Sequence, residues 1–180
     1  MLLALTLASC GLVNGDDDAA ATLTEALEAH QQGRLDEAIE LYKEVITEDP
    51  QNKFAWYNLG LIHQTRGSGN LAETEYREAL AIDPAFVPAM FNLAILQTSR
   101  GVPEESVELY RGVIAIQPEY AAAHLNLGFL LIDLGEKKEG KRELEQAVAL
   151  DPSLASRIPD ELAANVQPPS EIAPAESPSA

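Results

Sequence analysis

The chain has 180 residues and a formal charge of −17 at pH 7, from 29 Asp and Glu against 12 Lys and Arg. This balance argues against nucleic acid as a partner, because affinity for nucleic acid depends on basic side chains that neutralise phosphates. One cysteine in the sequence excludes a disulfide within the chain.

The first nine residues are apolar and lead into Leu7-Ala8-Ser9-Cys10, which contains the one cysteine. This tetrapeptide resembles the lipobox of bacterial lipoproteins, in which the signal is cut before the cysteine and the cysteine is acylated. The resemblance implies a signal peptide over residues 1–9, a lipid on Cys10 and an acidic tether over residues 10–18. The protein would then be lipid-anchored to a bacterial cell membrane on its extracytoplasmic side. The alternative is an apolar chain end with a lone apolar cysteine in a cytoplasmic protein.

Glycine and proline recur with a fixed period in the rest of the chain. Two series of residues are each spaced by 34 positions: Gly33, Gly67, Gly101 and Gly135, and Pro50, Pro84, Pro118 and Pro152. A period of this size is typical of stacked supersecondary units that bury their apolar faces against their neighbours. We therefore divide the chain into repeats over residues 19–52, 53–86, 87–120 and 121–154.

The second repeat shows most clearly what each unit should be. Apolar and small residues recur at spacings of three and four, first around Trp56 and then around Tyr76, which predicts two helices. Gly67 is suited to end the first helix because it lacks a Cβ and can adopt a left-handed conformation. Pro84 cannot continue the second helix. Each repeat is therefore predicted to be a helix, a turn and an antiparallel helix, with Trp56 on the interior face.

Small residues at two positions of each repeat would let its helices approach closely, and a large residue fills the space beside them. The small residues are Ala26, Gly60, Ala94 and Gly128, then Ala38, Ala72, Ser106 and Gly140; the large ones are Tyr42, Tyr76, Tyr110 and Leu144. This pattern resembles the tetratricopeptide repeat (TPR). The resemblance implies an all-α fold, a right-handed superhelical α-solenoid of four helix-turn-helix repeats. Residues 155–166 are expected to form a short capping segment, and the Pro- and Ser-rich residues 167–180 a disordered tail.

In proteins of this family the first helices line a concave groove that binds a protein or peptide. Carried over by repeat position, the contact residues are Phe54, Tyr57, Asn58, Leu61, Gln64, Phe91, Asn92, Ile95, Leu125, Asn126 and Phe129. These side chains are apolar or uncharged in an acidic protein, as expected of an interaction surface. The three asparagines resemble those that line the repeat domain of the N-acetylglucosaminyltransferase of intracellular proteins, and could bind a peptide backbone. Alternatively, they bond only to neighbouring helices.

Residues that could support catalysis are sparse. His30, His63 and His124 occupy different repeat positions, and no Cys or His pair has zinc-ligand spacing. Glycine-rich phosphate loops are absent from the sequence, and the basic cluster over residues 137–142 is interleaved with glutamates, as on a solvated helix face. We therefore expect no enzyme, metal, cofactor or small-molecule substrate.

Two functions fit these observations. The first is a non-catalytic scaffold or adaptor that binds a partner's peptide segment in the groove and supports assembly of the bacterial cell envelope. The second is a soluble cytosolic subunit that regulates or targets an enzyme encoded elsewhere. The state of Cys10 distinguishes them. A clamp for acidic tails is not expected, because no lysine lies at the groove positions.

Overall fold

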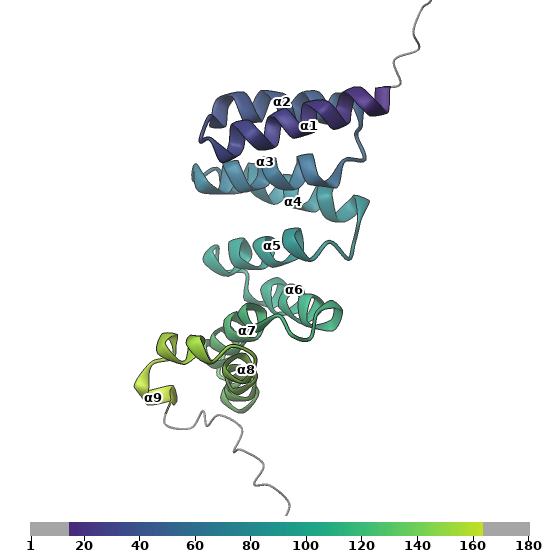
Figure 1. Cartoon of the computed structure of the whole chain (residues 1–180). Coiled ribbons are helices and arrows are strands. Elements are labelled where there is room, and N and C mark those ends of the chain that lie inside the picture. The colour runs from purple at the N-terminus through teal and green to yellow at the C-terminus, as the bar shows by residue number, and fades with distance from the viewer. Residues whose placement is uncertain (1–14, 164–180) are drawn as a thin grey trace, which may run out of the picture. The chain divides into compact units, whose positions relative to one another are not determined.

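The computed structural model describes residues 15–163, which form helices joined by short turns (Figure 1). The helices are α1 (Gly15–Gln31), α2 (Leu35–Glu48), α3 (Lys53–Thr65), α4 (Gly69–Ile82), α5 (Val87–Ser99), α6 (Pro103–Ile116), α7 (Ala121–Asp133) and α8 (Lys137–Leu150), then the 3₁₀ helix η1 (Pro152–Arg157) and α9 (Asp160–Ala163). Within this range there is no strand, which confirms the all-α prediction. The predicted signal peptide, Cys10 and the predicted tail lie outside the described residues.

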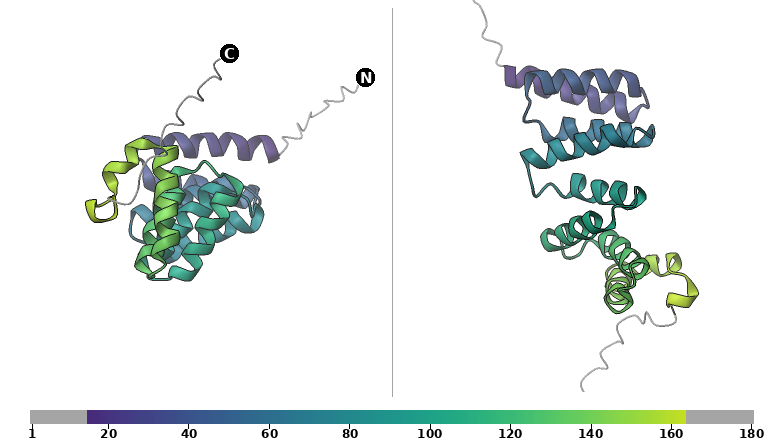
Figure 2. Two further views of the ribbon diagram at one scale, coloured as in Figure 1. Left: turned by 90° about the horizontal axis from the view of Figure 1, so that it is seen from below. Right: turned by 180° about the vertical axis from the view of Figure 1, so that it is seen from behind.

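The chain divides into two compact units, residues 1–84 and residues 85–180. The first contains α1 to α4 and the second contains α5 to α9. Within each unit, consecutive helices pack as pairs: α1 with α2 and α3 with α4, then α5 with α6 and α7 with α8 (Figures 1 and 2). Further contacts join α2 to α3 and α6 to α7.

One glycine follows the first helix of each pair, as the 34-residue spacing predicts. Gly33, Gly67, Gly101 and Gly135 have φ of 74°, 75°, 72° and 90°. In the second repeat the Gly67 N–H donates to the Gln64 carbonyl at 3.0 Å, and the Ser68 N–H donates to the His63 carbonyl at 2.8 Å. This pair of bonds, the Schellman motif, satisfies carbonyls that the helix leaves without a partner. Such turns reverse the chain within two or three residues.

Small residues bring paired helices into close contact. A Cβ added to Gly60 would lie 2.5 Å from Cε1 of Tyr76, and one added to Gly140 would lie 2.6 Å from the carbonyl oxygen of Gly128. Both distances are shorter than van der Waals contact, so neither position accepts a side chain without movement of its neighbour. The tyrosines predicted to fill the adjacent space, Tyr42, Tyr76 and Tyr110, are buried.

Trp56 differs from its prediction. Its indole is only partly buried, so it is not one of the core side chains, and its Nε1 donates to the Pro50 carbonyl at 3.2 Å. His124 occupies the same repeat position in α7 and places Nε2 2.9 Å from the Pro118 carbonyl. A ring N–H at this position therefore ties the first helix to the preceding proline turn, and a histidine can replace the tryptophan.

Candidate functional site

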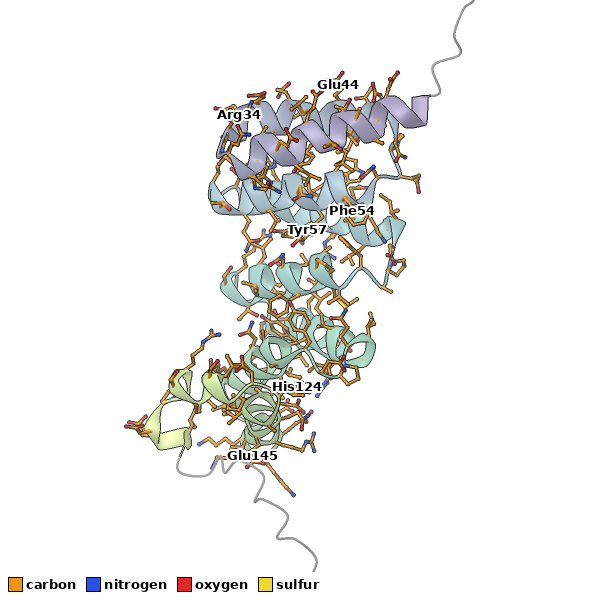
Figure 3. The ribbon with its side chains drawn as sticks, viewed as in Figure 1. Arg34, Glu44, Phe54, Tyr57, His124 and Glu145 are labelled. Carbon is orange, nitrogen blue, oxygen red and sulfur yellow. The ribbon has the colours of Figure 1, made fainter. Side chains whose placement is uncertain are left out.

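The predicted contact residues lie on α3 in the first unit and on α5 and α7 in the second. On α3, Phe54 is 49% exposed, and the Lys53 ammonium lies 5.4 Å from the centre of its ring. Figure 3 shows Phe54 and Tyr57 on this helix. The Tyr57 ring packs at 6.0 Å against Tyr76, whose hydroxyl donates to Gln64 Oε1 at 2.5 Å. On α3, the Phe54 side chain is thus exposed, whereas Tyr57 and Gln64 contact α4.

Beside Phe54 lies a hollow of about 400 Å³ in the first unit. Five polar and two apolar residues line it, namely Asp49, Gln51, Asn52, Lys53, Phe54, Ile82 and Asp83. An ion pair between Lys53 and Asp83 lies in this lining. Of the predicted contact residues, Phe54 alone lines this hollow.

In the second unit, a hollow of about 450 Å³ brings together three of the predicted residues. Its lining comprises Ile95, Thr98 and Ser99 from α5, Tyr110 from α6, Asn126, Phe129, Leu130 and Asp133 from α7, and Arg157 from η1. The volume lies within the range of ligand pockets. Apolar side chains, hydroxyls, an amide and two opposite charges therefore face one space.

Tyr110 provides the buried polar group of this hollow. It is 1% exposed, and the amide of Asn126 donates to its hydroxyl at 3.4 Å. Burial raises the pKa of Tyr110, while hydrogen bonds with Thr98 and Asn126 act in the opposite direction. The phenol therefore stays protonated at neutral pH, and its hydroxyl bonds to the Thr98 and Asn126 side chains beside it.

Phe91 and Asn92 lie on α5 but do not line the hollow. The Phe91 ring lies between two tyrosines, with its centre 5.9 Å from that of Tyr110 and 4.9 Å from that of Tyr120. Phe91 therefore packs behind Tyr110, which lines the hollow. Asn92 and Leu61, the latter on α3, are partly buried.

Leu125 departs most from its prediction as a groove residue. It is 0% exposed and belongs to a cluster with Leu144, Ala147, Val148 and Ile158. Residues after α8 pack back against α8 and contribute Ile158 to this cluster, so Leu125 is a core residue in this structure. The sequence indicated that apolar residues of this segment could cover the end of the repeats, but not that they cover a predicted contact residue.

Asn58 and Asn126 each donate a hydrogen bond within the chain. Asn58 Nδ2 donates to the Phe54 carbonyl on its own helix at 2.7 Å, and Asn126 Nδ2 donates to Tyr110. The Asn126 bond joins α7 to α6, as expected if the asparagines bond to neighbouring helices, whereas the Asn58 bond stays within α3. A side-chain amide has two N–H donors and an oxygen acceptor, so contact with a peptide remains compatible with them.

A histidine and a glutamate form a largely buried pair in each unit. His63 Nδ1 lies 2.8 Å from both carboxylate oxygens of Glu75, and burial raises the pKa of Glu75 while His63 opposes that change. His124, labelled in Figure 3, lies 2.7 Å from Glu143 through Nδ1. Each pair joins the two helices of one repeat. The described part of the chain contains no group of three or more residues suited to hold a metal ion.

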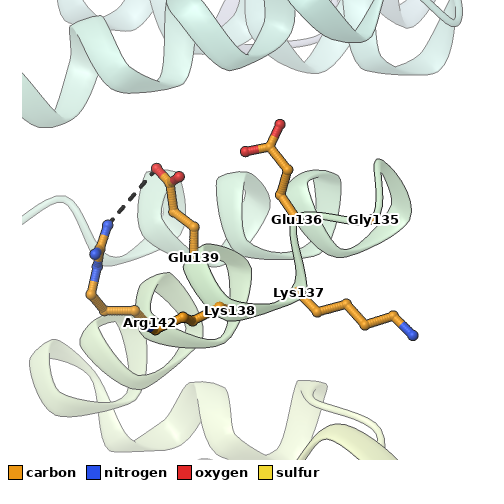
Figure 4. Close-up of a pocket in the computed structure, with 6 residues that line it drawn as sticks. All are labelled: Gly135, Glu136, Lys137, Lys138, Glu139 and Arg142. Carbon is orange, nitrogen blue, oxygen red and sulfur yellow. Dashed lines mark ion pairs between the residues drawn. The ribbon is translucent and has the colours of Figure 1, made fainter.

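The basic residues of α8 do not form one positively charged patch. Arg142 and Glu139 form an ion pair at 3.8 Å, while Lys137 extends away from them (Figure 4). The shallow hollow at this place, of about 440 Å³, is lined by acidic and basic residues together. Such alternation matches a solvated helix face.

Among the described residues, no helix combines the length and the apolar character needed to cross a membrane.

Two family profiles match the repeats described above. A profile described as the middle TPR-like domain of cilia and flagella-associated protein 70 matches residues 22–124, more than half of the chain. The chain belongs to this family of tetratricopeptide repeats. A second profile, described as tetratricopeptide repeat, matches residues 98–158. A search of curated proteins found no match.

Solved structures share the fold. A crystal structure of MamA has a TM-score of 0.70 at 20% identity, covering 78% of this chain and 82% of MamA. PilF of Pseudomonas aeruginosa has a TM-score of 0.70 at 22% identity, covering 84% and 67% respectively. The first TPR domain of Spaghetti (RPAP3), bound to the HSP90 peptide SRMEEVD, has a TM-score of 0.62 at 21% identity, covering 66% of this chain and 94% of that domain.

Proposed function

We propose that the chain is a non-catalytic adaptor that binds a segment of a partner protein in the hollow of its second unit. The observation that carries this proposal is the joint lining of the hollow by Ile95, Asn126 and Phe129, residues from two first helices of successive repeats. An RPAP3 domain of the same fold is bound to a peptide, which supports a peptide as the kind of ligand.

The lining favours a peptide segment with an apolar side chain. Ile95 and Phe129 offer apolar surface, while the Asn126 amide has a further N–H and an oxygen that can bond to peptide C=O and N–H groups. Asp133 and Arg157 lie on the exposed margin. An apolar centre with a polar margin is typical of protein-binding surfaces.

Filling the hollow tests this proposal. Thr98 is exposed, and its hydroxyl bonds to the Ala94 carbonyl four residues earlier at 2.8 Å. Thr47 on α2 is also exposed and bonds to the Lys43 carbonyl at 2.8 Å. Thr98→Arg should weaken partner binding at least tenfold, about 1.4 kcal/mol, because the longer side chain occupies the hollow. Thr47→Arg, which adds the same charge and loses the same kind of bond, should leave binding unchanged.

The partner is first identified by affinity capture from bacterial envelope extract and then titrated as a purified protein. Circular dichroism must show that both variants are as helical as the wild type. Equal affinity of all three proteins would remove the hollow from the mechanism.

We further propose that Cys10 anchors the protein to the extracytoplasmic side of a bacterial membrane and that the adaptor supports envelope assembly. The lipobox-like Leu7-Ala8-Ser9-Cys10 supports this proposal, and stable anchoring would require two or more acyl chains. The native protein should partition into detergent, and Cys10→Ala should move it to the aqueous phase or stop processing. Intact mass measures the acylation directly. A native protein that retains Met1 and carries no lipid would contradict the anchor and favour the cytosolic alternative.

A further inference from the structure

The segment after α8 contacts the preceding helices through one row of apolar side chains. Leu154, Ile158 and Leu162 are spaced four residues apart and pack with the cluster of α7 and α8. Ile158 is 6% exposed, whereas its neighbours Arg157 and Pro159 are exposed. The contact therefore depends on a narrow apolar edge.

This edge covers a continuation of the proposed binding surface. The cluster includes Leu125, Phe129 and Ile132 of α7, which lie at spacings of four and three on one helix face. Phe129 also lines the hollow, and Arg157 of the covering segment lines it from η1. The hollow and the covered face thus share a side chain.

We propose that residues 152–162 are an intramolecular occupant of the α7 face, and that a partner segment with apolar side chains four residues apart competes with them for this face. The proposal rests on the proposed function, and it specifies the partner chemistry for that surface. The chain's own Leu154, Ile158 and Leu162 show a pattern that packs in the cluster containing Leu125.

The form of the segment suits it to displacement. Its two elements have six and four residues, and Pro159 separates them. The backbone bonds that support them are local, such as Leu154 N–H to the Asp151 carbonyl at 3.1 Å and Ile158 N–H to the Ala155 carbonyl at 3.2 Å. Segments with few buried apolar contacts open at lower free energy than the core to which they attach.

Competition has a measurable consequence. A ligand that requires the open form binds with an apparent affinity reduced by the fraction of molecules that are open. A short link also keeps the attached segment at an effective concentration of the order of mM. Weakening the intramolecular contact should therefore strengthen binding of the same sequence added as a separate peptide.

The probe is a fluorescent synthetic peptide with the sequence of residues 151–162, titrated by anisotropy into the full chain. Ile158→Asp in the protein should bind it at least tenfold more tightly than the wild type, because the charge expels the attached segment from the apolar cluster. Leu71→Asp is the matched control. Leu71 is 52% exposed on α4 in the other unit, so this variant should bind the peptide as the wild type does. A peptide carrying the Ile158→Asp change should not bind any of the proteins.

Hydrogen exchange of α7 and α8 accompanies the titration and detects loss of folding. If Ile158→Asp unfolds these helices, the milder Ile158→Ala replaces it and should show a smaller gain of the same sign. Equal affinities of wild type and Ile158 variants, or no binding by any of them, would show a fixed cap and overturn the proposal. Unfolding by both variants would do the same. If the purified partner still binds the wild type and Thr98→Arg abolishes that binding, the proposed function stands without the competition.

Discussion

Helices α3 and α7 occupy the same place in their repeats, yet their corresponding faces differ. At the same repeat position, Tyr57 on α3 is partly buried, whereas Leu125 on α7 is 0% exposed and lies in a cluster with Ile158, which follows the last repeat. Both helices begin after a proline turn, and both end in a glycine with positive φ. The difference teaches that the repeat fixes where a side chain points, whereas a segment outside the repeat decides whether that side chain is available to a partner.

The largest expected effect compares leucines on these two faces. Leu125→Ala should lower the free energy of unfolding by about 2–5 kcal/mol, since it leaves a cavity under Ile158. Leu61→Ala on α3 should cost about 1 kcal/mol, because a partly buried side chain loses less on truncation. Urea denaturation followed by circular dichroism measures both. Equal losses would mean that the α7 face is not covered in solution.

A second prediction compares the close contact of α7 with α8 to that of α3 with α4. Gly140 occupies the repeat position of Ala72, which is buried with its side chain in place. Gly140→Ala should destabilise the protein by about 1–3 kcal/mol, because its Cβ would lie 2.6 Å from the Gly128 carbonyl oxygen. Higher helix propensity offsets this only by about 1 kcal/mol.

Gly112→Ala is the control for this prediction. A Cβ there would meet the Met90 sulfur at 2.8 Å, and a flexible thioether can move aside. That variant should be as stable as the wild type or more stable. A Gly140→Ala protein with unchanged stability would show that the two helix pairs are packed alike.

The smallest effect concerns high pH. Burial raises the pKa of Tyr42 to about 12, above its ordinary value near 10, so the unfolded chain loses the phenolic proton before the folded chain does. The stabilising contribution is therefore complete below pH 10 and is lost as pH rises toward 12, by about 1–2 kcal/mol. Leu144, at the same repeat position in α8, cannot contribute such a loss.

Comparing Tyr42→Phe with the wild type isolates this contribution. Between pH 9 and 11, the variant should lose less of its free energy of unfolding than the wild type, measured by urea denaturation. An identical loss in the two proteins would assign the alkaline effect to other groups.

Periodic features were predictable from the sequence because they depend on local conformation. Gly67 and its equivalents were expected to be left-handed, and their positive φ confirms this. Small residues were expected to allow close helix contact, and Gly60 against Tyr76 shows it. The partial exposure of Trp56 was not predicted, because helix periodicity gives the face of a residue but not the depth of its burial.

The remaining parts of the site depend on contacts between segments that no repeat relates. Arg157 joins the hollow only because η1 folds back on the last helix pair, and Ile158 joins the cluster of Leu125 for the same reason. A 34-residue pattern contains no information on such pairs, although the sequence predicted a capping segment over residues 155–166.

Photo-crosslinking tests most directly whether a partner binds in the hollow of the second unit. A benzophenone side chain is placed at Thr98 in one protein and at Thr47 in another, each is irradiated with the purified partner, and the joined peptides are identified by mass spectrometry. We predict an adduct from position 98, formed with one apolar segment of the partner, and none from position 47. An adduct from position 47 alone, with the partner still bound to both proteins, would contradict the account.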